Sequence, residues 1–307
     1  MIRFFPEGIL VGTEENRAAV SSVSSLTEAM HEGRILEAVA VMCDSRHDLI
    51  VELGGVRGVI PREEGAIGIR EGTVRDIAVI SRVNRPVCFI VTEIERDEFG
   101  YLTARLSRRA AQERCLEAYV KKLRSGDVVT VRVTHLEHFG AFADIGCGIP
   151  SLLPIDSMSV SRIDHPMQRF SVGDEIRAIV RSNEDGRVCL THKELLGTWE
   201  ENAARFAVGQ TVMGVVRSVE SYGAFIELAP NLAGLSELRP GLRSGMRVSV
   251  YIKNIIPQKM KVKLIVIDTF GEESDIAKPE YFYKGEHMNS FRYSPEGCPK
   301  IIETIFS

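Results

Sequence analysis

The sequence lacks a basic excess, a paired-cysteine motif and any long apolar run. Its 307 residues carry a formal net charge of −4, which argues against a protein that coats a nucleic-acid duplex by positive charge alone. The six cysteines include no C-x-x-C pair, so we expect reduced thiols rather than a disulfide framework or a zinc site. Because neither a signal peptide nor an apolar run of about 20 residues is present, we expect a cytoplasmic protein without membrane association.

Catalytic signatures are also missing. The sequence has no glycine-rich phosphate loop, no G-x-S-x-G and no H-E-x-x-H. His135 and His138 are three residues apart on an expected strand, which sends them to different faces and argues against a shared metal ion. We therefore expect no catalysis, no cofactor and no metal.

One short strand pair occurs twice. Residues 131–145 read V-R-V-T-H-L-E-H-F-G-A-F-A-D-I, and residues 215–228 read V-V-R-S-V-E-S-Y-G-A-F-I-E-L. Aligning the two aromatic-Gly-Ala-aromatic cores places Phe139 on Tyr222 at an offset of 83 residues, and Gly126 and Gly209 have the same offset. An offset that holds at both points indicates a duplicated unit.

The residues of this strand pair suggest a surface role. Apolar and polar residues alternate at period two, as in a half-buried strand. Gly140 and Gly223 lack a Cβ, so each can bulge its strand or let another backbone approach closely. Rings three residues apart point to opposite faces of a regular strand, and we predict a bulge at the glycine that turns both outward. Two exposed rings on one barrel face form a stacking platform for unpaired bases; the alternative is that all four rings belong to the core.

Three motifs of the second copy carry a family resemblance. They are Gly126-Asp127-Val128-Val129, then Phe139 to Asp144, then Gly186-Arg187-Val188-Cys189-Leu190-Thr191. In this order they resemble S1-type RNA-binding domains, and the chain as a whole looks like the bacterial ribosomal protein S1-like family. The resemblance spans roughly residues 33–268. It implies an all-β fold of tandem five-stranded OB-fold barrels, joined by short α-helical linkers.

On this basis the chain divides into seven segments. They are an N-terminal lead-in (1–32), a divergent first S1-like domain (33–108), a helical linker (109–125), a second S1 domain (126–193), another helical linker (194–208), a third S1 domain (209–268) and a C-terminal tail (269–307). The first domain lacks the aromatic pair, because His47 and Ile50 stand in its place, so we expect it to be structural or a docking surface. Its β-branched residues predict strands at 74–81, 87–94 and 101–107.

The linkers have features of their own. Ser107 is the expected N-cap of the first, which carries the densest basic stretch in the chain, formed by Arg105, Arg108, Arg109, Arg114, Lys121, Lys122 and Arg124. That stretch is either a solvated helix face or a phosphate-tracking surface. Trp199, the only tryptophan, is expected to pack between barrels rather than stack on a base.

The expected ligand is single-stranded RNA. Phe139, Phe142, Tyr222 and Phe225 would stack bases. By resemblance Arg187 would reach a phosphate or a base, and Lys261 stands at the same place in the third domain, although its lysine-rich hairpin could equally guard a strand edge. The resemblance implies messenger RNA and the small ribosomal subunit as partners. Two alternatives stay open: a non-ribosomal regulator of RNA decay or transcription, and a protein-docking scaffold.

Overall fold

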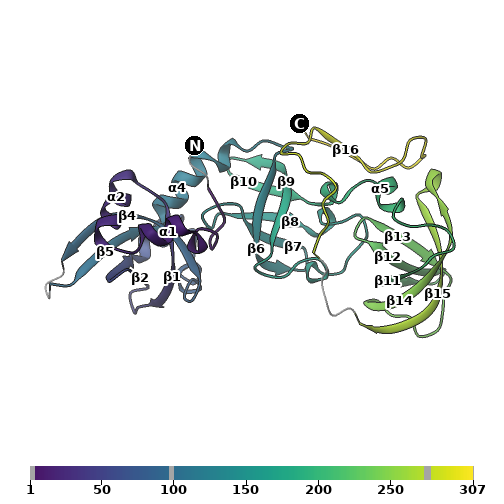
Figure 1. Cartoon of the computed structure of the whole chain (residues 1–307), viewed down its shortest axis with the longest axis horizontal. Coiled ribbons are helices and arrows are strands. Elements are labelled where there is room, and N and C mark those ends of the chain that lie inside the picture. Colours follow the sequence, from purple (N-terminus) through teal and green to yellow (C-terminus); the bar gives the residue numbers. More distant parts are fainter. Residues whose placement is uncertain (1–3, 97–99, 273–277, 307) are drawn as a thin grey trace. The chain divides into compact units, whose positions relative to one another are not determined.

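The structure is a computed structural model that describes residues 4–96, 100–272 and 278–306. The chain forms two compact units, one of residues 1–123 with 144–150 and the other of residues 124–143 with 151–307. Each unit is described by itself below (Figure 1).

The first unit contains a closed barrel with the strand order β1-β2-β3-β5-β4. Its strands are β1 (Leu36–Cys43), β2 (Leu49–Leu53), β3 (Val56–Ile60), β4 (Pro86–Arg96) and β5 (Leu102–Ser107). The third and fifth strands pair in parallel and close the barrel, while the other pairs are antiparallel. Apolar residues at alternate positions, such as Leu49, Val51 and Leu53, fill the interior.

Two short helices from the N-terminal segment complete the core of this unit. They are α1 (Glu14–Ala19) and α2 (Val23–Glu32), which follow the 3₁₀ turn η1 (Leu10–Gly12). Ser22 caps the start of α2, and Gly33 ends it at a φ of 63°, which is the left-handed conformation that favours glycine. Leu26 and Ala29 of α2 are fully buried against the barrel.

One expected strand is wrong. Within residues 74–81 the chain forms α3 (Ile77–Ile80), after the 3₁₀ turn η2 (Arg62–Glu64). The single turn of helix places Val79 in the core and leaves Ile77 exposed. The β-branched residues therefore reflect packing at this point, and tertiary contacts override their strand preference.

The first linker forms α4 (Arg108–Ala118), followed by η3 (Val120–Lys122). Ser107 caps α4 by accepting a hydrogen bond from the Ala110 N–H at 2.8 Å, as the sequence predicts. Much of the basic stretch is used within this unit. Arg108 is buried, Arg109 pairs with Glu113 at 2.8 Å, and the Arg114 guanidinium donates to the Gly33 carbonyl.

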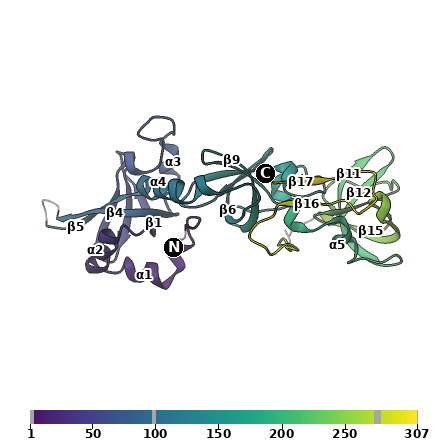
Figure 2. The same ribbon diagram turned by 90° about the horizontal axis from the view of Figure 1, so that it is seen from above.

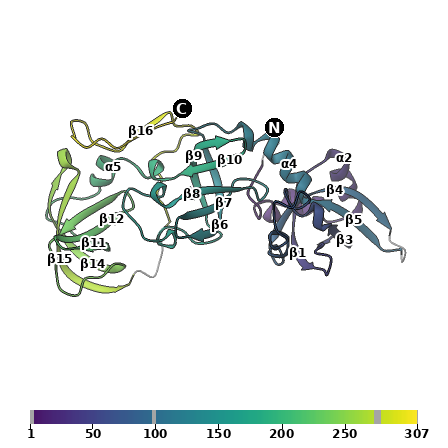
Figure 3. The same cartoon turned by 180° about the vertical axis from the view of Figure 1, so that it is seen from behind.

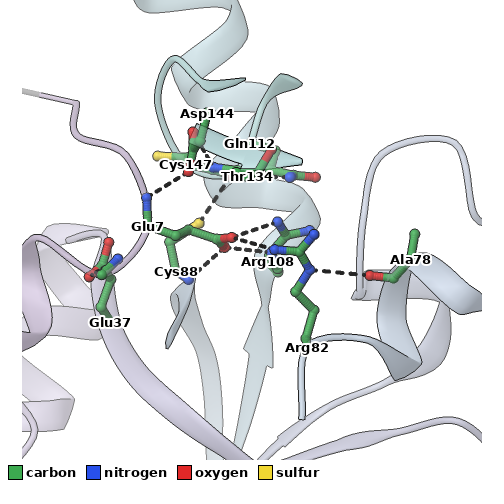
Figure 4. A network of polar contacts seen from close by, with 12 residues as sticks. Glu7, Glu37, Ala78, Arg82, Cys88, Arg108, Gln112, Thr134, Asp144 and Cys147 are labelled. Atoms are coloured by element: carbon green, nitrogen blue, oxygen red, sulfur yellow. Dashed lines mark hydrogen bonds and ion pairs between the residues drawn. The ribbon is translucent and has the colours of Figure 1, made fainter. Parts of the chain in front are cut away.

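Arg108 belongs to a buried polar network (Figure 4). Its Nε and Nη2 donate to the two carboxylate oxygens of Glu7 at 2.6 and 2.9 Å. The Cys88 N–H donates to the same carboxylate at 3.0 Å. Burial opposes ionisation of Glu7, but Arg108, Arg82 and the Cys88 N–H together outweigh burial and lower the pKa of Glu7. The Glu7 N–H in turn donates to Asp144 at 2.7 Å, so the N-terminal segment binds residues 144–150.

The second unit contains two more closed barrels. The first of them consists of β6 (Val128–Glu137), β7 (Gly140–Asp144), β8 (Pro150–Pro154), β9 (Glu175–Glu184) and β10 (Arg187–Thr191), with residues 144–150 grouping with the first unit. The next consists of β11 (Thr211–Glu220), β12 (Gly223–Ala229), β13 (Leu232–Ser236), β14 (Met246–Ile256) and β15 (Lys261–Glu272). In both, the third and fifth strands are parallel. Three five-stranded barrels with one topology confirm the predicted fold class.

A helical linker and the C-terminal tail pack against these two barrels. The linker contains η6 (Lys193–Leu196) and α5 (Trp199–Ala203), and Trp199 is buried in the core of the third barrel. The tail carries the strand pair β16 (Ser290–Arg292) and β17 (Glu303–Ile305). The tail, in yellow, runs along both barrels in Figure 2 and Figure 3. Tyr281 accepts a hydrogen bond from Arg177 of the second barrel, and Tyr293 donates one to Asn231 of the third.

Among the residues that the structure describes, no helix is both long enough and apolar enough to cross a membrane.

Candidate nucleic-acid interface

The strand register places equivalent positions on the face of each barrel. In the third barrel, Phe225 of β12 lies opposite Leu235 of β13, which lies opposite Lys263 of β15. The corresponding row in the first barrel is Ile50, Val59 and Arg105. In the second barrel, Leu152 lies opposite Cys189. Arg187 and Lys261 each stand two residues before the last member of their row, so the register makes them equivalent.

The aromatic pairs repeat the same geometry in the second and third barrels. Phe139 and Tyr222 precede β7 and β12 and are 56% and 66% exposed. Phe142 and Phe225 lie on those strands and are half-buried. The ring centroids are 6.0 Å apart in one pair and 6.2 Å in the other, and both pairs are edge-to-face at 89°. The outer ring of each pair therefore lies outside the core and is open to a ligand.

The glycine between the rings has a different role from the predicted bulge. In the third barrel β12 keeps a regular register with β11 at Gly223, and the irregularity falls on β11 between Val216 and Ser218. Both rings share a face because Tyr222 lies in the turn before the strand. A Cβ on Gly140 would lie 2.5 Å from the Leu153 carbonyl oxygen of the next strand. The bulge prediction is wrong at Gly223 of the third barrel, and close approach of a neighbouring backbone explains why a glycine is needed at Gly140.

Histidines extend the aromatic surface of the second barrel. His135 stacks beside Phe142 with centroids 6.4 Å apart, and His138 meets His165 edge-to-face at 4.7 Å. His135 also contacts Glu137 at 2.7 Å. The sequence alone does not relate His135 or His138 to the ring pair, because no local pattern marks a histidine that stacks beside an aromatic ring. Over the described ranges, the structure has no cluster of three or more side chains suited to hold a metal ion.

Exposed cations lie on the closing strands of the second and third barrels. Arg187 is exposed at the start of β10, and Lys261 and Lys263 are exposed on β15. The hairpin between β14 and β15 adds Lys259 in η7 (Pro257–Lys259). These lysines do not guard a free strand edge, because β15 is paired on both sides within a closed barrel.

Among its described residues, the first barrel has no ring pair at the position equivalent to those of the other two. His47 adopts a φ of 66° in a turn and contacts Asp76 at 3.3 Å, and Ile50 is buried. Its exposed apolar side chains lie elsewhere, on β1 and α3, and include Val39, Met42 and Ile77. The described positions equivalent to the ring pairs therefore carry no aromatic platform in this barrel.

Comparison with known proteins shows that the chain is S1-like. Residues 122–192, which contain the second barrel, match the S1 RNA binding domain. The chain is 31% identical over 237 residues to small ribosomal subunit protein bS1 of Leuconostoc lactis, covering 71% of this chain and 53% of that protein. It is 28% identical to bS1 of Rhizobium meliloti (strain 1021), covering 70% and 39%. It is 27% identical to bS1 of Staphylococcus haemolyticus, covering 87% and 69%. The chain thus spans about half the length, or less, of the first two of these relatives.

Proposed function

Since the chain is S1-like, with an S1 RNA binding domain at its centre, we propose that it binds single-stranded RNA and carries out no catalysis. Phe139 with Phe142, and Tyr222 with Phe225, stack the bases. Arg187 and Lys261 hold phosphates or base edges. One observation carries this proposal: the same exposed edge-to-face ring pair occurs at the same place in two barrels of one unit.

Stacking suits a protein without a basic excess. Each base stacked on an aromatic ring contributes about 1–3 kcal/mol, and any base can stack because all have a π face. Because the net charge is −4, only local cations such as Arg187 and Lys261 attract the RNA phosphates. Binding should therefore weaken as salt rises, with a slope that reflects a few phosphate contacts.

The ring pairs supply a direct test. Tyr222→Ala/Phe225→Ala and Phe139→Ala/Phe142→Ala should each weaken binding of a labelled single-stranded RNA by roughly 10-fold or more. Tyr101→Ala is the matched control, since Tyr101 is 72% exposed but belongs to the first unit and to neither ring pair. Unlabelled duplex should compete poorly. If the control and the ring variants bind equally, the rings are not the binding surface.

We further propose a role in translation, in which the chain brings messenger RNA to the small ribosomal subunit. The support is its similarity to three proteins that are named as small ribosomal subunit protein bS1. Sedimentation of a native lysate tests this role. Co-migration with the small subunit is the expected result, and recovery only in light fractions would favour a non-ribosomal RNA regulator.

A further inference from the structure

A groove of about 840 Å³ opens beside the Tyr222–Phe225 ring pair. Its walls come from four parts of the second unit. The third barrel supplies residues of β11, β12 and β13 and the start of β15 with the turn before it, and the linker supplies Trp199 of α5. The second barrel supplies residues 160–164 after β8, and the tail supplies residues of its hairpin between 293 and 302. The volume lies within the roughly 300–1,000 Å³ of typical ligand sites.

Asn231 holds these walls together. It is fully buried in the turn between β12 and β13. Its side-chain oxygen accepts from the Val160 N–H at 3.0 Å, and its side-chain nitrogen donates to the carbonyls of Lys193 and Gly197 at 2.8 and 2.9 Å. Its own carbonyl accepts from the Tyr293 hydroxyl at 2.5 Å. Every polar atom of this amide group has a partner, so the groove is a built feature of the unit.

The groove gathers positive charge from separate segments. Arg162, Lys259, Lys261 and Lys300 line it, and all four are exposed. Over the described part of the chain, no ion pair neutralises any of the four, whereas Arg217 at the groove wall is buried and paired with Glu227 at 3.0 Å. Two acidic residues, Asp164 and Glu220, also line the groove. The four cations outnumber these two carboxylates, and a bound polyanion relieves the repulsion that remains between them.

We propose that this groove is the path of the RNA strand beyond the Tyr222–Phe225 ring pair. Lys300 of the tail and Arg162 of the second barrel hold its phosphates together with Lys259 of the third barrel. This inference rests on the proposed function and extends it to a composite site. It gives the C-terminal tail a binding role, and the third barrel alone would lack two of the cations.

The test is charge reversal in the full chain. Lys300→Glu should weaken binding of a labelled single-stranded RNA by roughly 10-fold at low salt and reduce the slope of log K against log salt by about one. Arg162→Glu, made from a different segment, should act in the same way. Lys284→Glu is the matched control: Lys284 is an exposed tail lysine that does not line the groove, and this variant should bind within about two-fold of wild type. Thermal unfolding of each variant checks that the fold is intact.

Trp199 gives an independent readout, because it is the only tryptophan and lies at the groove wall. Its emission should change when RNA binds to wild type, and the change should be lost in Lys300→Glu. If the ring variants lose RNA binding while Lys300→Glu and Arg162→Glu behave as wild type, the groove assignment is overturned and the proposed function stands. If Lys300→Glu and Lys284→Glu weaken RNA binding equally, the effect is one of overall charge and the groove assignment is also overturned. A wild type that binds no RNA would refute the proposed function itself.

Discussion

Removing one partner of the buried Glu7–Arg108 pair should destabilise the first unit strongly. In Arg108→Met the Glu7 carboxylate, only 6% exposed, loses two hydrogen bonds of 2.6 and 2.9 Å. The Gly65 carbonyl also loses its bond of 3.0 Å from Arg108. Arg82, at 3.4 Å, remains as a charged partner of Glu7 (Figure 4).

The size of the loss follows from the uncompensated charge. Breaking a buried ion pair from one side costs about 3–5 kcal/mol, and the remaining Arg82 contact places this case near the lower end. With a urea m-value of about 1–3 kcal/mol per molar, the midpoint should fall by roughly 2 M. Glu7→Gln in the Arg108→Met background should recover roughly half of the loss, because no charge is then left buried and the amide oxygen still accepts from Cys88.

Buried thiols allow this unit to be followed by itself. Cys88, Cys115 and Cys147 are at most 2% exposed and all belong to the first unit. Pulsed thiol labelling along a urea series, read by peptide mass spectrometry, reports when they become accessible. Lys121→Met is the control, because it breaks an exposed i,i+4 pair with Glu117 that contributes about 0.5 kcal/mol or less. Equal midpoints for Arg108→Met and Lys121→Met would refute the reasoning.

Two further predictions concern single residues. Burial raises the pKa of Glu37 from 4.5 to about 7, so the folded state holds this proton more tightly than the unfolded chain does. The first unit should therefore lose stability, on the order of 3 kcal/mol, as pH rises from about 4.5 to about 7. Urea midpoints at pH 5 and pH 8 should show this loss, and Glu37→Gln should reduce the difference; an unchanged difference would contradict the assignment. Gly140→Ala should lower the thermal midpoint, at a cost in stability on the order of 2 kcal/mol, because the added Cβ would meet the Leu153 carbonyl oxygen. Gly271→Ala is the control and should be neutral, since no atom lies within 4 Å of a Cβ added there. Equal effects of the two substitutions would show that the strands at Gly140 can move apart.

The barrels and their ring pairs could be predicted because their signals are local. Alternation at period two and the fixed offset between Phe139 and Tyr222 specify strands and a duplication without any knowledge of distant contacts. The same pattern predicts that the rings are exposed, but it does not show why both rings share one face. The ring before the glycine lies in a turn, and turn boundaries are poorly marked in a sequence.

The remaining features depend on contacts between residues far apart in the chain. A run of arginines cannot show that Arg108 is buried, since its partner Glu7 is 101 residues away. The tail has no periodicity of its own, and it is ordered by contacts such as that of Tyr293 with Asn231, 62 residues away. The groove at the third barrel draws Arg162 and Lys300 together from two segments, which no local pattern relates.

The most direct test of the account is fluorescence anisotropy of a labelled single-stranded RNA at two salt concentrations. The titration compares wild type with a Phe139→Ala/Phe142→Ala/Tyr222→Ala/Phe225→Ala variant that is shown to be folded. We predict that wild type binds, that its affinity falls with salt, and that the variant loses about 100-fold or more in affinity. Equal affinity of the two proteins, or no binding by either, would contradict the claim that the paired rings of the second and third barrels bind RNA.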